Sequence, residues 1–265
     1  GVGCLVDSCQ TCASCGDGLE QYCENGFTGT YGSIEKQSGK PTQGGYSDGI
    51  VVDERFVVRI PDGMDLAGAA PLLCAGITTF SPLREWKAGP GKRVGVVGLG
   101  GLGHMAVKLA HAMGAHVTLF TTSPGKVEDG RRLGADDVVI STDKKEMKRV
   151  RNSLDLIIDT VSAPHDLDAE LNLLRRDGTL VLLGGSPVPH PSPSVWPFIT
   201  GRRRLAGSLI GGLPETQEML DFCAAHGIVS DIELIDAKDI NSAYERMLEA
   251  DVKYRFVIDV ATING

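Results

Sequence analysis

Four closely spaced cysteines are the residues of this sequence best suited to hold a metal ion. Cys9, Cys12, Cys15 and Cys23 form the pattern C-x2-C-x2-C-x7-C in a segment that contains glycine. Four thiolates at this spacing can close around one tetrahedral zinc ion, which then has no open position for chemistry. The spacing therefore predicts a structural zinc site in a lobe formed by residues 9–23.

Three other uses of these cysteines have to be weighed. Disulfides are typical of exported proteins, but no signal peptide is apparent and neighbouring pairs would be cramped. A ferredoxin-type cluster places three residues before its fourth cysteine and proline after it, whereas seven residues precede Cys23 and Glu24 follows it. A redox-active C-x-x-C pair accounts for only two of the four thiols.

A glycine-rich turn indicates a second kind of chemistry. The sequence GLGGLG matches G-x-G-x-x-G at Gly98, Gly100 and Gly103, between a Val-rich apolar run and a segment with helical spacing of apolar residues. Glycines in this strand–turn–helix order let backbone N–H groups approach a pyrophosphate, which the positive end of the helix favours. Because the context matches as well as the motif, we predict a dinucleotide-binding site.

The end of the next expected strand predicts which dinucleotide binds. An NAD site places Asp or Glu about 20 residues after the motif to bind the ribose hydroxyl, but Thr121, Thr122 and Ser123 stand here, followed by Lys126. Hydroxyls and an ammonium group suit the 2′-phosphate of NADP(H). The alternative is an ordinary polar loop, because Thr-Thr-Ser-Pro-Gly is also good turn chemistry.

The whole chain has the composition of a globular protein. Its 265 residues include 42% hydrophobic residues and carry a formal net charge of −8. This charge argues against a nucleic-acid partner, and no apolar run of membrane-spanning length occurs, so we expect no membrane association and a cytoplasmic location. The sequence starts with Gly1 in a segment typical of a strand interior, so we expect the chain to begin within a fold.

Hydrophobic periodicity predicts alternating strands and helices around the glycine turn. The expected strands are 93–98, 116–121, 137–140, 154–159, 180–184 and 205–210, and the expected helices are 102–113, 126–133, 146–151, 163–174 and 199–204. This alternation predicts an α/β doubly wound parallel sheet. We expect a β-rich unit before it, with a strand pair over 50–59 and Asp65 as a helix N-cap.

The C-terminal segment is too short to form its own domain. Its expected elements are helices at 215–226 and 240–250 and strands at 232–235 and 254–260. We therefore expect it to return and complete the β-rich unit at the start of the chain.

Together these motifs resemble the zinc-dependent medium-chain dehydrogenases/reductases, most closely the cinnamyl-alcohol dehydrogenase branch with its bacterial NADPH-dependent aldehyde reductases. The resemblance covers nearly the whole chain and includes the four-Cys lobe, PLLCAGITTFSPL (71–83), GLGGLG (98–103), TTSPGK (121–126) and KYRFVIDV (253–260). It implies a Rossmann domain inserted in a GroES-like, N-terminally incomplete catalytic domain. The implied boundaries are 1–74 for the partial catalytic domain, 75–213 for the NADP-binding domain and 214–265 for the return to the catalytic domain.

The resemblance also implies roles for individual residues. Cys74, which composition alone would make a buried hydrophobic residue, is implied to ligate a catalytic zinc, and Thr78 to lie by the nicotinamide. The implied cofactor contacts are Gly98, Gly100, Gly101, Leu102 and Gly103 at the pyrophosphate, Thr121, Thr122, Ser123 and Lys126 at the 2′-phosphate, Leu183, Ser208 and Ile210 at the nicotinamide, and Arg255 at the pyrophosphate. For the last four, sheet core or surface charge is the alternative.

One departure from the family pattern is large. The other ligands of the catalytic zinc lie in a Cys-containing segment and a Gly-His-Glu segment that have no counterpart here, and the proton-relay residues are also missing. The six histidines, at positions 104, 111, 116, 165, 190 and 226, match none of those places and are expected to be surface or satisfied core imidazoles. The chain thus offers one catalytic ligand and no complete catalytic site.

The resemblance implies a zinc- and NADP(H)-dependent alcohol dehydrogenase or aldehyde reductase. Its hydride transfer would convert an aryl, cinnamyl or aliphatic aldehyde to a primary alcohol, with a homodimer as the expected assembly. The alternatives are a zinc-free medium-chain quinone or enone reductase and a non-catalytic NADP-binding fragment.

Overall fold

The computed structural model describes residues 1–263, which form two compact units. Unit 1 consists of Gly1–Ile77 together with the chain from Ile210 onward, and unit 2 consists of Thr78–Leu209. The C-terminal segment thus returns to the N-terminal unit, and the limits of unit 2 differ by a few residues from the expected 75–213.

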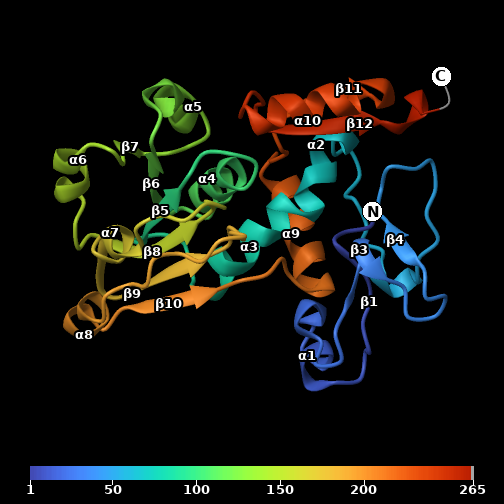
Figure 1. The fold of residues 1–265 in the computed structure, drawn as a ribbon, viewed down its shortest axis with the longest axis horizontal. Helices are drawn as coiled ribbons and strands as arrows, with labels where there is room; N and C mark the ends of the chain where they lie inside the picture. Colours follow the sequence, from blue (N-terminus) through green and yellow to red (C-terminus); the bar gives the residue numbers. More distant parts are fainter. Residues whose placement is uncertain (264–265) are drawn as a thin grey trace. The chain divides into compact units, whose positions relative to one another are not determined.

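Unit 2 is built on one parallel sheet of six strands in the order β10-β9-β8-β5-β6-β7 (Figure 1). The strands are β5 Arg93–Val97, β6 His116–Thr121, β7 Asp137–Ile140, β8 Leu154–Asp159, β9 Leu174–Leu182 and β10 Arg204–Gly207. From β5 the chain builds the sheet first toward β7, and then from β8 toward β10 on the other side. This reversal is the topological switch point of a doubly wound fold, so the predicted fold class is confirmed.

Helices follow most of these strands. They are α3 Ala75–Glu85, which begins in unit 1, α4 Gly103–Ala112, α5 Val127–Arg132, α6 Lys144–Arg149, α7 Leu167–Leu171 and α8 Trp196–Gly201, with the short 3-10 helix η4 Pro124–Lys126. In this structure α4 packs against β5 and β6, α5 against β7, and α7 and α8 against β9. One buried apolar cluster joins β6, β8 and α7 through Phe120, Ile157 and Leu171, and so packs the helix against the sheet.

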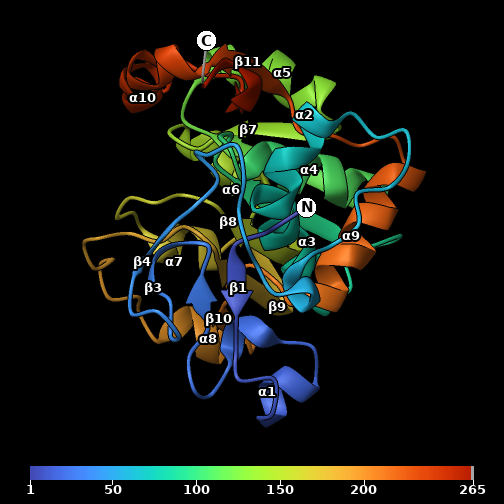
Figure 2. The same cartoon turned by 90° about the vertical axis from the view of Figure 1, so that its right-hand side faces the viewer.

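Unit 1 contains three small sheets rather than one large one. β1 Leu5–Asp7 pairs with β2 Thr28–Gly29, and β3 Tyr31–Ile34 pairs with β4 Pro41–Gln43, both antiparallel, whereas β11 Ile232–Asp236 and β12 Arg255–Asp259 are parallel. Its helices are α1 Ala13–Gly16, α2 Leu66–Ala69, α9 Leu213–Ala225 and α10 Ile240–Leu248, with 3-10 turns η1 Glu20–Tyr22, η2 Glu54–Phe56, η3 Ala70–Leu73, η5 Ala237–Asp239 and η6 Val260–Thr262. Figure 1 shows α10 beside the paired strands β11 and β12, and Figure 2 shows α10 and β11 from the side.

Capping explains where two of the helices begin. Asp65 accepts hydrogen bonds from the backbone N–H groups of Ala67 and Gly68, so the predicted N-cap of α2 is confirmed. The expected helix over 163–174 is much shorter, because Asp166 caps α7 at Leu167 and the chain already enters β9 at Leu174.

The expected strand pair over 50–59 was wrong. The Asp53 carboxylate accepts a hydrogen bond from the Arg55 N–H and forms an ion pair with its guanidinium, which stabilises the turn η2. Local side-chain bonds of this kind compete with strand pairing. In this segment the described structure shows one isolated β bridge, between Val2 and Val57.

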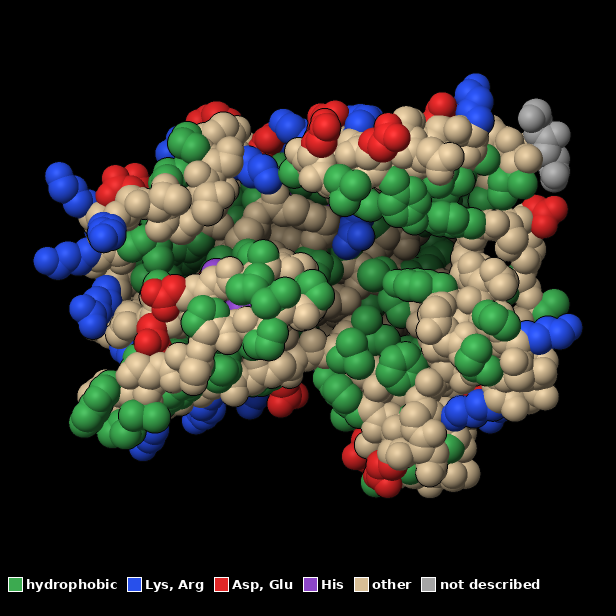
Figure 3. Space-filling view, viewed as in Figure 1, with side chains coloured by type: hydrophobic (Ala, Val, Ile, Leu, Met, Phe, Trp, Pro, Cys, Tyr) green, Lys and Arg blue, Asp and Glu red, His purple; other side chains and the backbone are tan. Residues whose placement is uncertain are grey.

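Charged side chains of both signs are interspersed on the face shown in Figure 3. Among residues 1–263 no single helix has the length and apolar composition to span a membrane, although the bent pair Leu66–Leu73 and Ala75–Glu85 meets that test jointly. Much of this pair is core, since Leu72, Ile77 and Leu83 are almost fully buried.

Candidate cofactor and metal sites

Three glycines of the turn after β5 differ in how well they could accommodate a side chain. Gly98 has φ +88°, a conformation that side-chain-bearing residues rarely adopt, and a Cβ at Gly103 would lie 2.0 Å from the Gly98 carbonyl oxygen. Gly103 therefore lets α4 start directly against the turn. A Cβ at Gly100 would meet no atom within 4 Å, so this position faces open space where a ligand can approach the backbone.

The N-terminus of α4 points its backbone toward the same turn. Leu102 occupies the N-cap position without a side-chain hydrogen bond, and the backbone N–H of His104 donates to the Gly100 carbonyl. His104 is fully buried with its Nδ1 3.1 Å from the same carbonyl oxygen, as expected of a satisfied core imidazole. An uncapped helix start beside a glycine turn suits a bound pyrophosphate.

The end of β6 is tied to the glycine turn by Lys126. Its Nζ donates to the backbone oxygen of Leu99 at 2.9 Å, and so holds an ammonium group between the end of β6 and the glycine turn. The Thr121 hydroxyl accepts a hydrogen bond from the Ser123 N–H at 3.2 Å, which shapes the bend between them, and Thr122 is exposed. The structure therefore brings the predicted 2′-phosphate residues and the glycine turn to one edge of the sheet.

Two further predicted contacts lie at the same carboxyl edge. Leu183 follows β9 and donates its N–H to Asp159 at the end of β8, and Ser208 follows β10 and donates its N–H to Leu182. Thr78 lies in α3 and is buried. Ile210 and Arg255 belong to unit 1, so their cofactor contacts stay predictions.

The four-Cys lobe of unit 1 has the geometry of a zinc site. The sulfur atoms of its four cysteines all lie within 4.8 Å of one another, and none of them is in a disulfide: Cys9, Cys12, Cys15 and Cys23. The Cys9 and Cys15 sulfurs are 3.9 Å apart, close to the edge of about 3.8 Å expected for a tetrahedron with zinc–sulfur bonds of ~2.3 Å.

Backbone donors around these sulfurs favour thiolates. The backbone N–H of Cys12 donates to the Cys9 sulfur at 3.3 Å, and the N–H of Cys9 donates to the Cys23 sulfur at 3.4 Å. The N–H of Glu24 donates to the Cys12 sulfur at 3.5 Å. Hydrogen bonds led by the one from Thr11 lower the pKa of Cys9 to about 5, whereas burial raises the pKa of Cys15 to about 11. The donor set fits one structural zinc ion, which would deprotonate all four thiols when bound.

Cys74 has a thiol neighbour that sequence reasoning missed. A hydrogen bond from Cys4 lowers the pKa of Cys74 to about 6, and the positive charge of Arg255 acts in the same direction against the effect of burial. The same pairing raises the pKa of Cys4 above its usual range. No spacing rule links these two cysteines, because β1 and η3 are brought together only by the fold.

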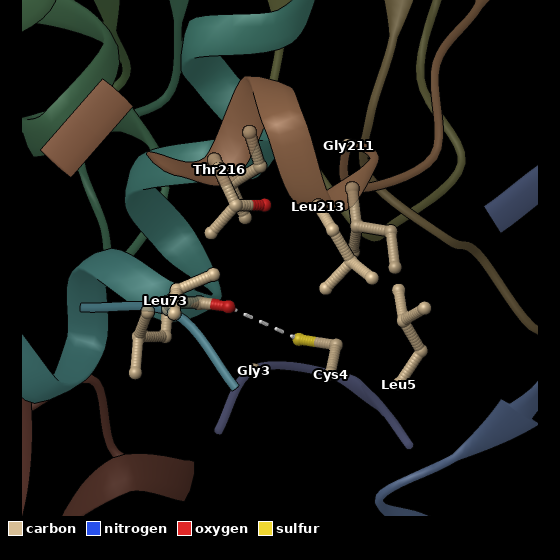
Figure 4. A pocket seen from close by; sticks show the side chains of 10 residues that line it. Gly3, Cys4, Leu5, Leu73, Gly211, Leu213 and Thr216 are labelled. Atoms are coloured by element: carbon tan, nitrogen blue, oxygen red, sulfur yellow. Dashed lines mark hydrogen bonds between the residues drawn. The ribbon is translucent and has the colours of Figure 1, made fainter. Parts of the chain in front are cut away.

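Cys4 also lines a small apolar pocket within unit 1. Its sulfur is 3.5 Å from the Leu73 carbonyl oxygen, and Leu5 and Leu213 lie beside it (Figure 4). The pocket has room for no more than about one water molecule, so it is a packing gap and not a substrate site.

The residues around Cys74 do not complete a catalytic zinc site. Within the described part of the chain, the groups that bring three or more ligand atoms together do not include Cys74. A catalytic zinc needs three protein ligands and an open position. Zinc ligation by Cys74 therefore stays a prediction, and we derive no reaction step through it.

Comparison with known proteins supports the same assignment as the geometry. Residues 101–225 match the family model described as zinc-binding dehydrogenase. The aldehyde reductase YahK of Escherichia coli is 61% identical over 99% of this chain and 75% of its own length. NADP-dependent alcohol dehydrogenase C 1 of Mycolicibacterium smegmatis is 58% identical over 100% of this chain and 76% of its own length.

A solved structure agrees in fold over nearly the whole chain. The cinnamyl alcohol dehydrogenase SbCAD4 of Sorghum bicolor superposes with a TM-score of 0.95 at 48% identity, covering 98% of this chain and 74% of that one. The chain thus spans about three quarters of the length of these relatives. Its sequence motifs, parallel sheet and four-Cys lobe, together with these likenesses, show that the chain belongs to the zinc-dependent medium-chain dehydrogenases/reductases, in the cinnamyl-alcohol dehydrogenase branch.

Proposed function

We propose that this chain binds NADP(H) at the carboxyl edge of the unit 2 sheet, for hydride transfer between NADPH and an aldehyde that gives a primary alcohol. Relatives that share more than half of its residues are named an aldehyde reductase and an NADP-dependent alcohol dehydrogenase. Aryl, cinnamyl and aliphatic aldehydes are the proposed substrate class. The homodimer and the cytoplasmic location implied by the family are proposed on the same ground.

The single observation that carries the proposal is the hydrogen bond from Lys126 to Leu99. It places a cation between the end of β6 and the glycine turn, where an NAD site would place a carboxylate. The first carboxylate after β6 is Glu128, which lies on α5 with a largely exposed side chain. This arrangement favours a 2′-phosphate over a free ribose hydroxyl.

The residues of unit 2 bind and orient the cofactor. The backbone at Gly98–Gly103 and the start of α4 would hold the pyrophosphate, while Lys126 and the hydroxyls before it would hold the 2′-phosphate. When bound, the reduced nicotinamide supplies the hydride that the carbonyl carbon of the aldehyde accepts. The protein supplies position and electrostatics.

Cinnamaldehyde distinguishes this function from its main alternative, because it contains both a carbonyl group and a conjugated carbon–carbon double bond. A carbonyl reductase converts it to cinnamyl alcohol, whereas an enone reductase saturates the double bond. The test incubates a high concentration of zinc-loaded protein with NADPH and cinnamaldehyde and identifies the product by chromatography.

The proposal predicts cinnamyl alcohol as the product. Formation of the saturated aldehyde would establish the zinc-free type of chemistry instead. Tight NADPH binding with no product from several different aldehydes would support the non-catalytic alternative.

A further inference from the structure

A second group of potential metal ligands lies in unit 2, apart from the cysteine lobe. Asp159 is the last residue of β8, His165 lies in the following loop and Glu170 lies on α7. One ligand atom from each lies within 4.8 Å of the others. The His165 Nε2 is 3.0 Å from a Glu170 oxygen and 3.2 Å from an Asp159 oxygen.

The orientation of the His165 ring is that of a metal ligand. Its Nδ1 lies 2.9 Å from the Ala163 carbonyl oxygen, which can only accept a hydrogen bond, so the proton of the neutral ring is held on Nδ1. The Nε2 lone pair then faces the two carboxylates. Fixing a histidine by a bond from its other nitrogen to a backbone carbonyl is the usual outer support of metal-binding histidines.

Two polar atoms of this cluster lack a hydrogen-bond partner, although Asp159 Oδ1 accepts a hydrogen bond from the Val161 N–H. His165 Nε2 and Glu170 Oε2 have no hydrogen-bond partner among the described residues, despite the short distances from Nε2 to both carboxylates. The Glu170 side chain is only 7% exposed and that of Asp159 only 1% exposed. Leaving the buried Glu170 Oε2 unpaired is costly, so a bound partner is expected to compensate it.

Charge balance favours a divalent partner. The described ion pairs give the two buried carboxylates one shared partner, the His165 ring, whose Nε2 lies 3.2 Å from Asp159 and 3.0 Å from Glu170. One imidazolium supplies a single positive charge to two carboxylates, whereas a divalent cation neutralises both.

The spacing of the ligand atoms fits a coordination shell. Ligand atoms bound at ~2.0–2.2 Å in tetrahedral or octahedral geometry are separated by about 2.9–3.5 Å, and the two measured distances fall in this range. Imidazole and carboxylate donors suit zinc and manganese. We propose that Asp159, His165 and Glu170 form a binding site for a divalent first-row metal ion of this kind, distinct from the cysteine site.

A metal ion here would brace the edge of the cofactor site. The ligands connect the end of β8 with α7 across the loop 160–166, and at the start of that loop the Thr160 hydroxyl donates to the Val97 oxygen at 2.7 Å. Val97 directly precedes Gly98 of the glycine turn. The backbone N–H of His165 also donates to Nδ1 of His190 at 3.4 Å.

Manganese is the probe that separates this site from the thiolates, because Mn²⁺ prefers oxygen and imidazole ligands to sulfur. Zinc-loaded full chain is titrated with Mn²⁺, and the free ion is followed by electron paramagnetic resonance. We expect one bound Mn²⁺ per chain. Glu170→Gln should weaken binding at least tenfold, whereas Glu128→Gln, which changes an exposed carboxylate on α5, should leave it unchanged.

His165→Gln provides a second variant that removes a partly exposed ligand, in case the buried change at Glu170 prevents folding. Nuclear magnetic resonance of wild-type protein should also show that Mn²⁺ broadens the ring signals of His165 and of the adjacent His190. Equal binding by wild type and both ligand variants would overturn the proposal. So would an absence of Mn²⁺ binding together with a His165 ring protonated on both nitrogens, because an ion-paired imidazolium would then account for the cluster.

Discussion

Three hydroxyl side chains and one ammonium group stand where an NAD site would carry a carboxylate. Thr121 is the last residue of β6, and Thr122 and Ser123 follow it. The Lys126 side chain extends back to the glycine turn. A cation that contacts the 2′-phosphate makes a charge-assisted hydrogen bond, the strongest kind available at a surface site. Cofactor choice should therefore depend on Lys126 more than on any other single residue.

Lys126→Ala should weaken NADPH binding about 10- to 100-fold, because a hydrogen bond to a charged group contributes ~1.5–3 kcal/mol. NADH, which lacks the phosphate, should bind the variant nearly as well as it binds wild type. Nicotinamide fluorescence titration measures both dissociation constants. Lys148→Ala, an exposed lysine on α6, is the control, and equal losses for NADPH and NADH would contradict the assignment.

Cys74 should react as a thiolate at neutral pH. Its pKa is lowered to about 6 from the usual 9, chiefly by the hydrogen bond from Cys4, so its alkylation by iodoacetamide should reach half its maximal rate near pH 6. Cys4→Ala removes the donor and should move this midpoint upward. Peptide mass spectrometry reports Cys74 separately from the other thiols.

Cys223→Ala removes a different buried thiol, on α9, and should leave the Cys74 profile in place. If Cys4→Ala left the midpoint near pH 6, the hydrogen bond would not be the cause of the shift.

Residue chemistry could be predicted from the sequence only where the residues are close together along the chain. The four-Cys pattern and the glycine motif are local, and the fold places them as expected. Cys4 and Cys74 are far apart in the sequence, whereas Asp159, His165 and Glu170 are close together but match no familiar ligand spacing. The contact between Cys4 and Cys74 depends on tertiary packing. A single sequence reveals such a contact only where a known motif encodes it.

At the scale of elements, the strand–turn–helix unit 93–112 is the structure on which cofactor binding depends. Gly103→Ala should lower the free energy of unfolding by about 3 kcal/mol or more, because the new methyl group would collide with the Gly98 carbonyl. Gly100→Ala should cost less than about 1 kcal/mol, since nothing surrounds that position.

Gly100→Ala, the milder of the two changes for stability, should have a large effect on cofactor binding. Gly100→Ala should keep its stability yet bind NADPH at least tenfold more weakly, because the methyl group would occupy space through which the pyrophosphate approaches. Urea denaturation and NADPH titration of the same samples provide the measurements. Wild-type affinity in Gly100→Ala would show that the cofactor does not lie against this turn.

The buried parallel strands were the elements most predictable from sequence. β6, β7 and β8 have the expected limits, because short segments rich in Val, Leu and Ile between turn signals have few alternatives in a parallel sheet. β9 was expected only over its apolar end at 180–184, yet it begins at Leu174 and includes the polar residues before it. In unit 1, where short strands and turns dominate, local bonds such as that of Asp53 overrode the alternation of apolar residues.

At the scale of the molecule, the two units carry separate chemistry. The cysteine lobe, Cys74 and Arg255 lie in unit 1, whereas the glycine turn, Lys126 and the Asp159 cluster lie in unit 2. The cofactor-binding unit contains a core of its own, so it should not depend on zinc for its fold.

Loss of the structural zinc should therefore leave NADPH binding intact. Cys15→Ser should remove one zinc per chain and make residues 9–23 sensitive to protease, because the lobe is ordered mainly by its metal. Metal analysis, limited proteolysis and NADPH titration measure the three effects, with Cys223→Ser as the control. Zinc retained in full by Cys15→Ser would show that the four thiols are not its ligands.

The central claim is that unit 2 is an NADP(H) site, and the most direct test compares the dissociation constants of NADPH and NADH for the unmodified chain under identical conditions. Our account predicts that NADPH binds at least tenfold more tightly, a difference of ~1.4 kcal/mol or more. Binding of NADH as tight as that of NADPH, or tighter, would contradict it.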